Sequence, residues 1–347
     1  MSDGRKRSRR FHGAYREAVA ALSTFRGELE AECACSDTFG GYAQSWLDYL
    51  AKMGEIRYST LRRYRNAVRA LDFEFKDVRL SDMTPERCRV GIAAIKSGNN
   101  FSHRELSGAY MAKLYSVLHA ILKMAVEDER INRDPLANST APKVDTREKD
   151  ALSPAQLAAL VGNLEALPMD GKVMCYLLMA YLGLRRGETC ALLVDDIDFD
   201  RSIVHVRHGI EEQDFTVAET KTHAGVRDLP APPQLLVDVR RWLDARSSMG
   251  WSACPTLACN ARGTLLRPSD LEKWWNGHRA ELGAEGMTMH QIRHSNLSMM
   301  ARHLNVFDLQ RWAGWASIEP ARVYVHADAE SLANGCADAF RHHFGTI

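Results

Sequence analysis

Residues 173–188 read VMCYLLMAYLGLRRGE, and this stretch decides how the second half of the chain folds. Its first ten residues form a strongly apolar run that predicts a helix, and Gly183 ends that helix. Arg185 and Arg186 then stand between two glycines at the start of the next helix. Backbone N–H groups at a helix start, together with a guanidinium fork, suit a phosphate group. An arginine pair exposed to solvent has the same local sequence, so the motif alone leaves both interpretations open.

Downstream of this stretch, short strands precede a second series of helices. The predicted strands are residues 202–207, 215–220 and 226–229, the last two joined by a turn at 222–225. Helical patterns follow at residues 232–246, 269–282, 288–302, 306–313 and near 320–325. Upstream, Ser153 and Pro154 open the domain as a capping residue and a first helical position. We therefore expect an α+β domain over residues 151–347.

The first half of the chain is predicted to be helical. Four helical patterns fall between residues 38 and 137, and we expect Ser59 and Thr84 to cap the second and the third of them. The fourth is long, has an apolar face and ends near Asp134. The chain is therefore predicted to be mostly α with a small β-sheet. Its expected parts are a basic arm (1–37), an all-α domain (38–137), a polar linker (138–150) and the α+β domain (151–347).

The composition is that of an ordinary globular protein. The 347 residues carry a formal net charge of +1, 46% of them are hydrophobic and 26% are charged. This length fits two domains. No run approaches the roughly 18 apolar residues of a membrane span, and no apolar run of a secretory signal follows the charged start. We therefore expect a cytoplasmic protein without a membrane partner. The eight cysteines are scattered, which favours reduced thiols, and no cofactor or metal is indicated.

Positive charge is concentrated in the first part of the chain. Residues 1–147 hold 25 Lys and Arg against 19 Asp and Glu, whereas residues 148–347 hold 20 against 25. In the second predicted helix, Arg62, Arg65 and Arg69 form a basic stripe opposite an apolar one. We treat these three arginines as candidates for contact with the phosphates of a nucleic acid. An ordinary solvated surface would carry the same charges, so the composition alone does not decide.

Two further motifs carry cationic groups. Lys221 lies at the end of a predicted strand, where most lysines only decorate a turn. The stretch TMHQIRH at residues 288–294 begins with a capping box and places His290 and Arg293 on one face of the first helical turn. A histidine and an arginine at a helix N-terminus oppose the helix dipole, which indicates an anion nearby. The alternative for His290 is a histidine that is simply hydrogen-bonded in a crevice.

The last motif surrounds a tyrosine. Trp315 follows Gly314, and Tyr324 lies about one helical segment further on, between two valines. An isolated tyrosine in an apolar context is usually a core residue. In this chain, however, the tyrosine completes a series. The motifs follow one another in the order Arg185, Lys221, His290 with Arg293, Trp315 and Tyr324.

In this order and at these separations, the motifs resemble those of the tyrosine recombinases, the phage-integrase family. That family's set is an arginine in a Gly-Leu-Arg-x-Gly-Glu turn, a lysine in a β-hairpin, His-x-x-Arg, a His or Trp, and a nucleophilic tyrosine. The resemblance covers roughly residues 38–330 and implies a helical core-binding domain, a SAM-like bundle, followed by a catalytic domain. The catalytic residues that it implies are Arg185, Lys221, His290, Arg293, Trp315 and Tyr324.

The resemblance implies a reaction that suits these residue types. Tyr324 is expected to attack a DNA phosphodiester and form a covalent 3′-phosphotyrosine, which keeps the bond energy for rejoining without ATP. Arg185 and Arg293 are expected to clamp the nonbridging oxygens, so that no metal is required. His290 is the expected base or orienting group, and Lys221 is the expected acid for the departing 5′-oxygen. The implied function is site-specific recombination, the integration or excision of a mobile element.

The resemblance has departures, and two alternative functions stay open. Leu182 and Gly183 replace the family's usual Thr-Gly, and Trp315 replaces a histidine; an indole N–H can donate to a phosphate oxygen but cannot shuttle a proton. A type IB-like topoisomerase uses the same covalent chemistry, and a catalytically silent DNA-binding relative would keep the fold. The helical core-binding domain and the segment 331–344 favour the recombinase over the topoisomerase, and the presence of all six residues argues against the silent relative. The implied partners are double-stranded DNA with specific recombination sites, a homotetramer on that DNA, and accessory DNA-bending or directionality proteins.

Overall fold

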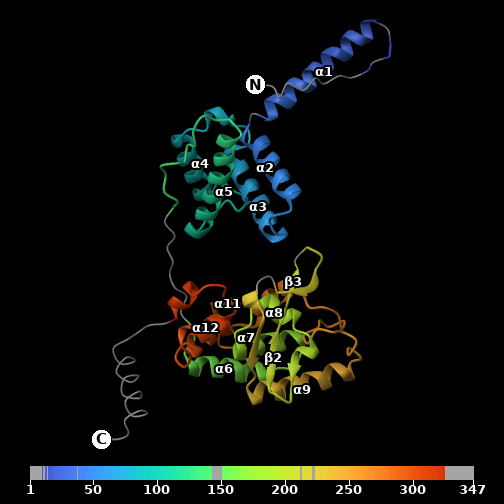
Figure 1. Cartoon of the computed structure of the whole chain (residues 1–347), viewed down its shortest axis with the longest axis vertical. Helices are drawn as coiled ribbons and strands as arrows, with labels where there is room; N and C mark the ends of the chain where they lie inside the picture. Colours follow the sequence, from blue (N-terminus) through green and yellow to red (C-terminus); the bar gives the residue numbers. More distant parts are fainter. Residues whose placement is uncertain are drawn as a thin grey trace, which may run out of the picture. The chain divides into compact units, whose positions relative to one another are not determined.

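The computed structural model describes Arg10 and residues 12–13, 15–36, 38–142, 151–211, 213–220 and 223–324, without the side chains of residues 26–36 and 223. The chain divides into two compact units, residues 1–147 and 148–347, which we call unit 1 and unit 2 (Figure 1). The finer division into an arm, a helical domain, a linker and a catalytic domain stays a prediction, because residues 1–9 and 143–150 lie outside the described residues.

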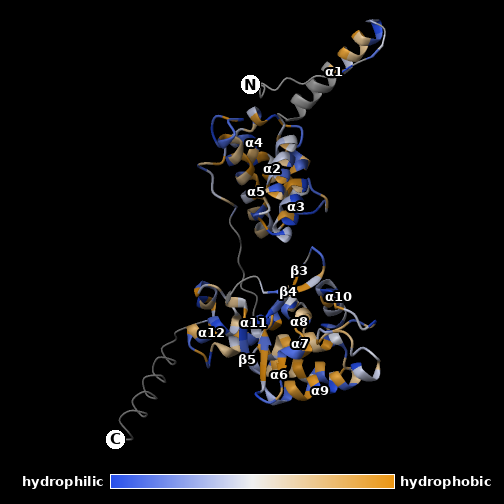
Figure 2. Cartoon of the chain, turned by 45° about the vertical axis from the view of Figure 1, so that its right-hand side comes forward, coloured by the Kyte–Doolittle hydropathy of each residue, from blue (hydrophilic) through white to orange (hydrophobic). Residues whose placement is uncertain are grey.

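Unit 1 consists of α-helices in the part that the structure describes. They are α1 (Tyr15–Ser36), α2 (Phe39–Met53), α3 (Tyr58–Phe75), α4 (Pro85–Ser97) and α5 (Gly108–Glu127). α3 packs against α2, α4 and α5, and fully buried side chains such as Phe39, Leu71 and Leu118 belong to their common core. Figure 2 shows hydrophobic residues on the inner faces of these helices and hydrophilic residues outside. The apolar stripe predicted for α3 therefore faces the core of unit 1.

Capping side chains set several of the helix boundaries in unit 1. Thr84 caps α4 as predicted, since its hydroxyl accepts a hydrogen bond of 3.1 Å from a backbone N–H of the first turn. The expected cap Ser59 is instead a residue of α3, which begins at Tyr58. The long helix α5 ends before Asp134, whose carboxylate lies 2.7 Å from Nε2 of His119 and so binds back to the helix.

Unit 2 combines helices with short strands. Its α-helices are α6 (Pro154–Glu165), α7 (Gly171–Leu182), α8 (Arg186–Ala191), α9 (Pro233–Ser248), α10 (Pro268–His278), α11 (Met289–Met300) and α12 (Val306–Ala313). Its strands are β1 (Ile197–Asp198), β2 (Ile203–Val206), β3 (His208–Glu211), β4 (Thr216–Glu219) and β5 (Arg227–Pro230). A 3₁₀ segment, η4 (Glu319–Val323), follows α12.

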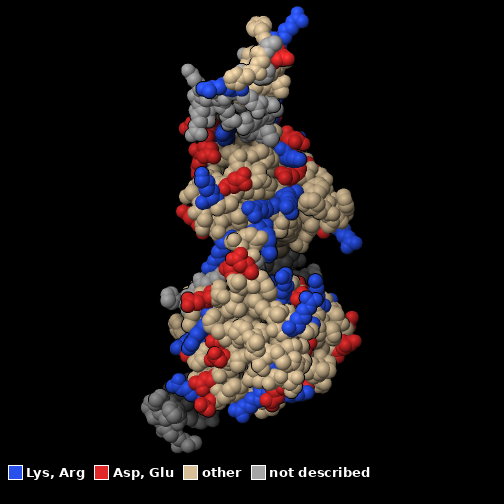
Figure 3. Space-filling view, turned by 90° about the vertical axis from the view of Figure 1, so that its right-hand side faces the viewer, with Lys and Arg blue, Asp and Glu red and all other residues tan. Residues whose placement is uncertain are grey.

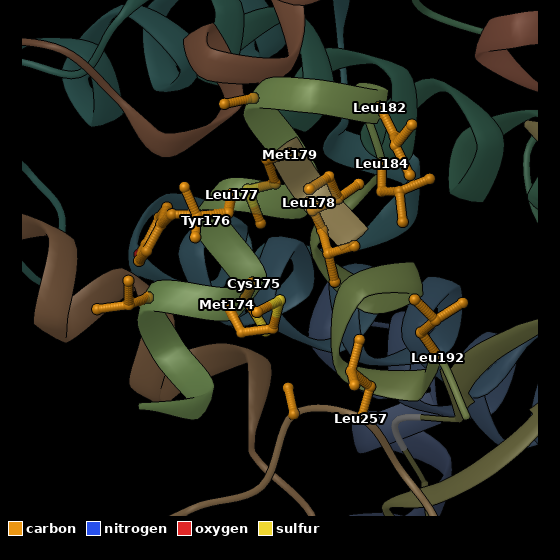
Figure 4. Close-up of a cluster of buried hydrophobic side chains, with 14 of the residues drawn as sticks. Met174, Cys175, Tyr176, Leu177, Leu178, Met179, Leu182, Leu184, Leu192 and Leu257 are labelled. Carbon is orange, nitrogen blue, oxygen red and sulfur yellow. The ribbon is translucent and has the colours of Figure 1, made fainter. Parts of the chain in front are cut away.

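The predicted apolar helix, α7, lies at the centre of unit 2. It packs against α6, α8, α9 and α11. Every side chain from Val173 to Leu182 is buried except that of Tyr181. Figure 4 shows this cluster, in which Leu192 and Leu257 join the side chains of α7. A helix that is apolar on all sides is stable only where other elements surround it, and unit 2 supplies them.

The strands form two small antiparallel sheets, with the order β1-β2-β5 in one and β3-β4 in the other. β2 and β3 follow each other with only Arg207 between them, and they pair with β5 and β4 respectively. The two strands predicted on either side of the turn at 222–225, β4 and β5, therefore do not pair with each other. Between the two pairings, the N–H of Thr220 donates to the carbonyl of Arg207 (2.8 Å). β3 was not predicted.

The structure also bears on metals and membranes. The cysteines that it describes in full are free, buried thiols: Cys88, Cys175, Cys190, Cys254 and Cys259. Among the described residues, no three His, Cys, Asp or Glu side chains lie together as metal ligands do. None of the described helices has the length and hydropathy that crossing a bilayer demands.

Candidate active site

The C-terminal turn of α12 is the point at which the site is assembled. The helix ends at Gly314, whose φ of 64° lies in the left-handed region. The carbonyls of a last helical turn need partners from outside the helix, and here three guanidinium groups supply them. Arg227 Nε donates to Trp312 O (2.8 Å), Arg293 Nη2 to Ala313 O (2.7 Å) and Arg185 Nη2 to Gly314 O (2.7 Å). The dipole of α12 favours cations at this end, so the turn collects and orients three arginines.

Arg185 is positioned by the turn between α7 and α8. This turn requires Gly183, because its φ is 62° and a Cβ there would lie 2.5 Å from Oδ1 of Asn296. Arg185 then precedes α8, and its backbone N–H and its Nη1 donate to the two carboxylate oxygens of Glu188, at 2.8 and 2.7 Å. The side chain of Arg185 nevertheless stays 39% exposed. Its guanidinium is therefore both fixed in place and accessible to a ligand.

Glu188 is the buried acid that joins the arginines. It accepts hydrogen bonds from Arg227 as well, from Nη2 at 2.9 Å and from Nη1 at 3.2 Å. Burial alone would raise the pKa of this carboxyl group, but the charges of Arg227, Arg185 and Arg293 outweigh burial and lower the pKa to about 2. Glu188 is therefore ionised at neutral pH and balances part of the positive charge around it.

Arg293 comes from α11, which begins with the predicted capping box of Thr288 and Gln291. Its side chain is only 4% exposed. Besides its bond to α12, its Nη1 donates to the carbonyl of Gly183. Burial, followed by the charge of Arg185, lowers the pKa of Arg293 to about 10, so the guanidinium stays charged at neutral pH. Arg293 thus ties the end of α7 to the end of α12.

His290 lies one turn before Arg293 and faces a cavity. The cavity has a volume of about 380 Å³, and Arg185, Arg293 and His290 contribute to its lining. The pKa of His290 is lowered, first by desolvation and then by the charge of Arg293. The cavity therefore has cationic guanidinium groups and a weakly basic imidazole in its wall, a combination that suits an anion.

Tyr324 directly follows η4 and lies beside two other rings. A hydrogen bond of 2.8 Å joins its hydroxyl to Nδ1 of His294. The centroid of its ring is 5.0 Å from that of His294 and 5.5 Å from that of Trp315. Burial raises the pKa of the phenol, and the charge of Arg293 opposes this rise. The phenol is thus held next to the helix that carries Arg293.

Unit 2 brings together five of the six predicted catalytic residues: Arg185, His290, Arg293, Trp315 and Tyr324. Lys221 lies outside the described residues, in the interruption between β4 and β5. The three arginines Arg62, Arg65 and Arg69 belong to unit 1, where they are exposed on α3. Figure 3, which views unit 1 from the side of α2 and α3, shows Lys and Arg gathered there among a few acidic side chains.

Three members of this arrangement were not predicted from the sequence, namely Glu188, Arg227 and His294. Glu188 stood in the first motif without a role. The pattern of β5 could have indicated Arg227. It lies two residues before Leu229, so both side chains are on the same face of the strand, and both are buried. A charged residue at an inward strand position needs a buried partner. His294 was visible as the second histidine of the TMHQIRH stretch, four residues after His290, yet nothing in the sequence tells which of the two reaches the tyrosine.

The chain is similar to known proteins in sequence. Residues 150–331 match the model of the phage integrase family. The chain is 28% identical to a prophage phiRv2 integrase of Mycobacterium tuberculosis over 293 residues, which are 83% of this chain and 74% of that protein. It is also 28% identical to the tyrosine recombinase XerC of Alcanivorax borkumensis over 243 residues, 67% of this chain and 73% of that one.

Solved structures share the fold. The Tn1549 transposon integrase in complex with a circular intermediate DNA matches 86% of this chain and 99% of its own, with a TM-score of 0.70 and 20% sequence identity. A lambda integrase tetramer bound to a Holliday junction matches 88% of each chain, with a TM-score of 0.62 and 16% identity.

Proposed function

This chain belongs to the phage integrase family, and on that premise we propose the chemistry that unit 2 performs. The protein is a tyrosine recombinase that breaks and rejoins DNA at specific sites. Its nucleophile is Tyr324, and its phosphate clamp is the pair Arg185 and Arg293. The relatives are integrases and recombinases, which supports this function over that of a topoisomerase or of a silent DNA-binding protein.

One observation carries the proposal: Arg185 and Arg293 bind the consecutive carbonyls of Gly314 and Ala313, and the same segment of chain continues to Tyr324. Two cations and a phenol from three different elements thus meet at one end of one helix. The carboxylate of Glu188 balances only part of the positive charge of Arg185, Arg227 and Arg293 at this turn. A phosphodiester, whose negative charge grows during attack, suits the remaining positive charge.

The reaction proceeds by nucleophilic substitution at phosphorus. The Tyr324 oxygen forms a bond to the scissile phosphorus, the bond from phosphorus to the 5′-oxygen breaks, and a 3′-phosphotyrosine and a 5′-hydroxyl result. Arg185 and Arg293 stabilise the charge on the nonbridging oxygens. Because carbonyls at the end of α12 already hold both guanidinium groups, and Glu188 also holds that of Arg185, little reorganisation is needed when that charge develops.

Three further groups complete the proposed site. Lys221 protonates the departing 5′-oxygen. His290, in the wall of the cavity beside both arginines, donates to a nonbridging oxygen. Trp315 packs near the Tyr324 ring, and its indole N–H is a donor for the phosphate. Rejoining needs no ATP, because the phosphotyrosine bond retains the free energy for it.

The proposed partner is double-stranded DNA that carries a recombination site. Solved relatives of the same fold are bound to DNA, and one of them is a tetramer on a Holliday junction. We extend this to a homotetramer of the present chain on two DNA duplexes, acting in the integration or excision of a mobile element. Accessory DNA-bending or directionality proteins belong to the same proposal. Arg62, Arg65 and Arg69 are the proposed phosphate contacts of unit 1.

A nicked suicide substrate tests this function. In such a duplex the cleaved strand loses the short 5′-hydroxyl fragment, so that the covalent complex accumulates. The wild-type protein is expected to give a covalent protein–DNA band, and Tyr324→Phe is expected to give none while it keeps its fold and its DNA affinity. Mass spectrometry of the proteolysed adduct should find the phosphate on Tyr324. A phosphotyrosyl peptide from elsewhere in the chain would overturn the assignment.

A further inference from the structure

The hydroxyl of Tyr324 hydrogen-bonds to a histidine outside the predicted catalytic set. The bond, 2.8 Å long, is made by Nδ1 of His294, the residue that directly follows Arg293 in α11. His290, the histidine expected to serve as a base, lines the cavity with the arginines instead. The two histidines of this helix therefore stand at different parts of the site, one toward the phosphate and one at the nucleophile.

The geometry of α11 also separates His294 from Arg293. Consecutive helical residues point about 100° apart, so Arg293 and His294 leave the helix in different directions. Arg293 reaches the carbonyls of Gly183 and Ala313. His294 reaches Tyr324 on the segment that follows α12. One rigid turn thus fixes both the group that holds the phosphate and the group that holds the attacking oxygen.

We propose that His294 orients the phenol of Tyr324 and accepts its proton during cleavage, an inference that rests on the proposed function. The neutral imidazole, with its own proton on Nε2, receives the phenol proton at Nδ1 as the bond from oxygen to phosphorus forms. The bond from phosphorus to the 5′-oxygen breaks in the same step, and the 5′-oxygen takes a proton from Lys221. In the rejoining step, the 5′-hydroxyl gives its proton back to Lys221 as its oxygen bonds to phosphorus. The bond from phosphorus to the Tyr324 oxygen breaks, and that oxygen takes back the proton from Nδ1 of His294.

The reaction requires a proton acceptor next to the phenol of Tyr324. A phenol has an ordinary pKa of about 10, so it is protonated at neutral pH, and burial raises the pKa of Tyr324 further. Attack by this oxygen therefore requires that its proton leave to a group within hydrogen-bond reach. Nδ1 of His294 is within that reach. General base catalysis of this kind contributes roughly 10²–10⁴ in rate.

If the role of His294 were only structural, the variants would be expected to behave differently. It would hold the ring of Tyr324 by packing and by one hydrogen bond, and any side chain that keeps that bond would replace it. His294→Asn is informative for this reason, because an asparagine amide can bond to the hydroxyl but cannot take its proton. His294→Ala removes both the bond and the base. His303→Asn is the matched control, since His303 is exposed just past the end of the same helix.

The first experiment compares two leaving groups in single-turnover cleavage of the suicide substrate. One substrate has the natural 5′-oxygen, and the other has a 5′-bridging sulfur, which leaves without being protonated. His294→Ala and His294→Asn are expected to cleave both substrates at least about 100-fold more slowly than the wild type. Lys221→Ala is expected to be slow only on the oxygen substrate. If the His294 variants cleave the sulfur substrate at the wild-type rate, His294 acts on the leaving group and the proposal is overturned.

The second experiment changes the acidity of the nucleophile. Trifluorotyrosine at position 324 has a more acidic phenol, which depends less on a base. The deficit of His294→Ala is expected to shrink with this residue, while the deficit of Arg185→Ala, which concerns the phosphate, should not change. An unchanged His294→Ala deficit, or a His294→Asn variant with wild-type rate, would show a structural role and overturn the proposal.

The outcomes separate this inference from the proposed function. Wild-type protein that forms no adduct on Tyr324 would overturn the function itself. Wild-type protein that reacts, together with His294 variants that fold, bind DNA and react equally fast, would overturn the role of His294 alone. Circular dichroism and DNA binding of each variant, with His303→Asn beside them, show that a lost rate does not come from a lost fold.

Discussion

Arg185 and Arg293 share a target but differ in how they are held. Arg185 is 39% exposed at its side chain, and its loss removes hydrogen bonds at the edge of the site. Arg293 is 4% exposed and connects the carbonyls of Gly183 and Ala313 inside unit 2. Removing Arg293 leaves buried carbonyl groups without a donor, which destabilises the fold as well as the reaction. Arg185 is therefore the cleaner probe of the phosphate clamp.

We expect Arg185→Ala to fold and to bind DNA but to cleave roughly 10²–10³ times more slowly, because one donor to the developing charge is lost. Single-turnover cleavage of the suicide substrate measures this rate. Arg302→Ala, an exposed arginine beyond α11, is the control and should cleave like the wild type. A normal rate for Arg185→Ala would remove Arg185 from the site.

At the scale of single residues, sequence order predicts more than sequence spacing. The order of the motifs was enough to select Arg185, Arg293 and Tyr324, which the structure brings to one helix end. It also selected His290 as the base or orienting group, whereas the histidine that the structure places at the Tyr324 hydroxyl is His294. Which histidine meets the tyrosine depends on where the segment after α12 returns. That return is a long-range feature that no local pattern encodes.

At the scale of elements, α8 depends on the ionised state of Glu188. The folded-state pKa of about 2 lies below the ordinary value of 4.5, so the carboxylate contributes stability that is complete above about pH 4.5 and is lost as the pH falls toward 2. The contribution at neutral pH amounts to about 3 kcal/mol, since one pKa unit corresponds to about 1.4 kcal/mol.

We therefore expect Glu188→Gln to lower the free energy of unfolding at neutral pH and to flatten its dependence on pH between about 4.5 and 2. Urea unfolding at a series of pH values measures both effects. Asp200→Asn, in the exposed turn before β2, should leave the pH dependence as it is in the wild type. An equally steep curve for Glu188→Gln would mean that another carboxylate carries the acid sensitivity.

The elements themselves were predictable to different degrees. Helices with a capping side chain, such as α4 at Thr84 and α6 at Ser153, begin where the sequence indicates, because the capping interaction is local. The strand positions were predicted in part, but their pairing was not. A turn pattern separates β4 from β5, yet β4 pairs with β3 and β5 pairs with β2. Pairing depends on partners distant in sequence, which a strand pattern does not name.

At the scale of the whole molecule, the two units divide the charge between them. Unit 1 has the excess of basic residues, and Arg62, Arg65 and Arg69 are exposed on one helix of it. We expect the triple change of these arginines to glutamine to weaken binding to any DNA sequence alike. Each lost phosphate contact should lower the slope of log affinity against log salt by about 0.9.

A second variant, which loses the same charge elsewhere on unit 1, distinguishes contact through the α3 face from a general effect of net charge. Neutralising Arg87, Lys113 and Lys123, which are exposed on α4 and α5, removes the same charge from unit 1. If the α3 face contacts DNA, this second variant should keep a salt slope closer to that of the wild type. Equal slopes for the two variants would indicate a diffuse field with no particular face.

The binding of three arginines to the last turn of α12 has a consequence for the control of activity. In the proposed function, the segment that leads to the nucleophile also holds the phosphate clamp, since Arg185 and Arg293, like Arg227, donate to carbonyls of that turn. A displacement of this segment therefore cannot silence Tyr324 and leave the clamp intact. In the proposed function, one short turn thus couples the position of the nucleophile to the position of the phosphate clamp.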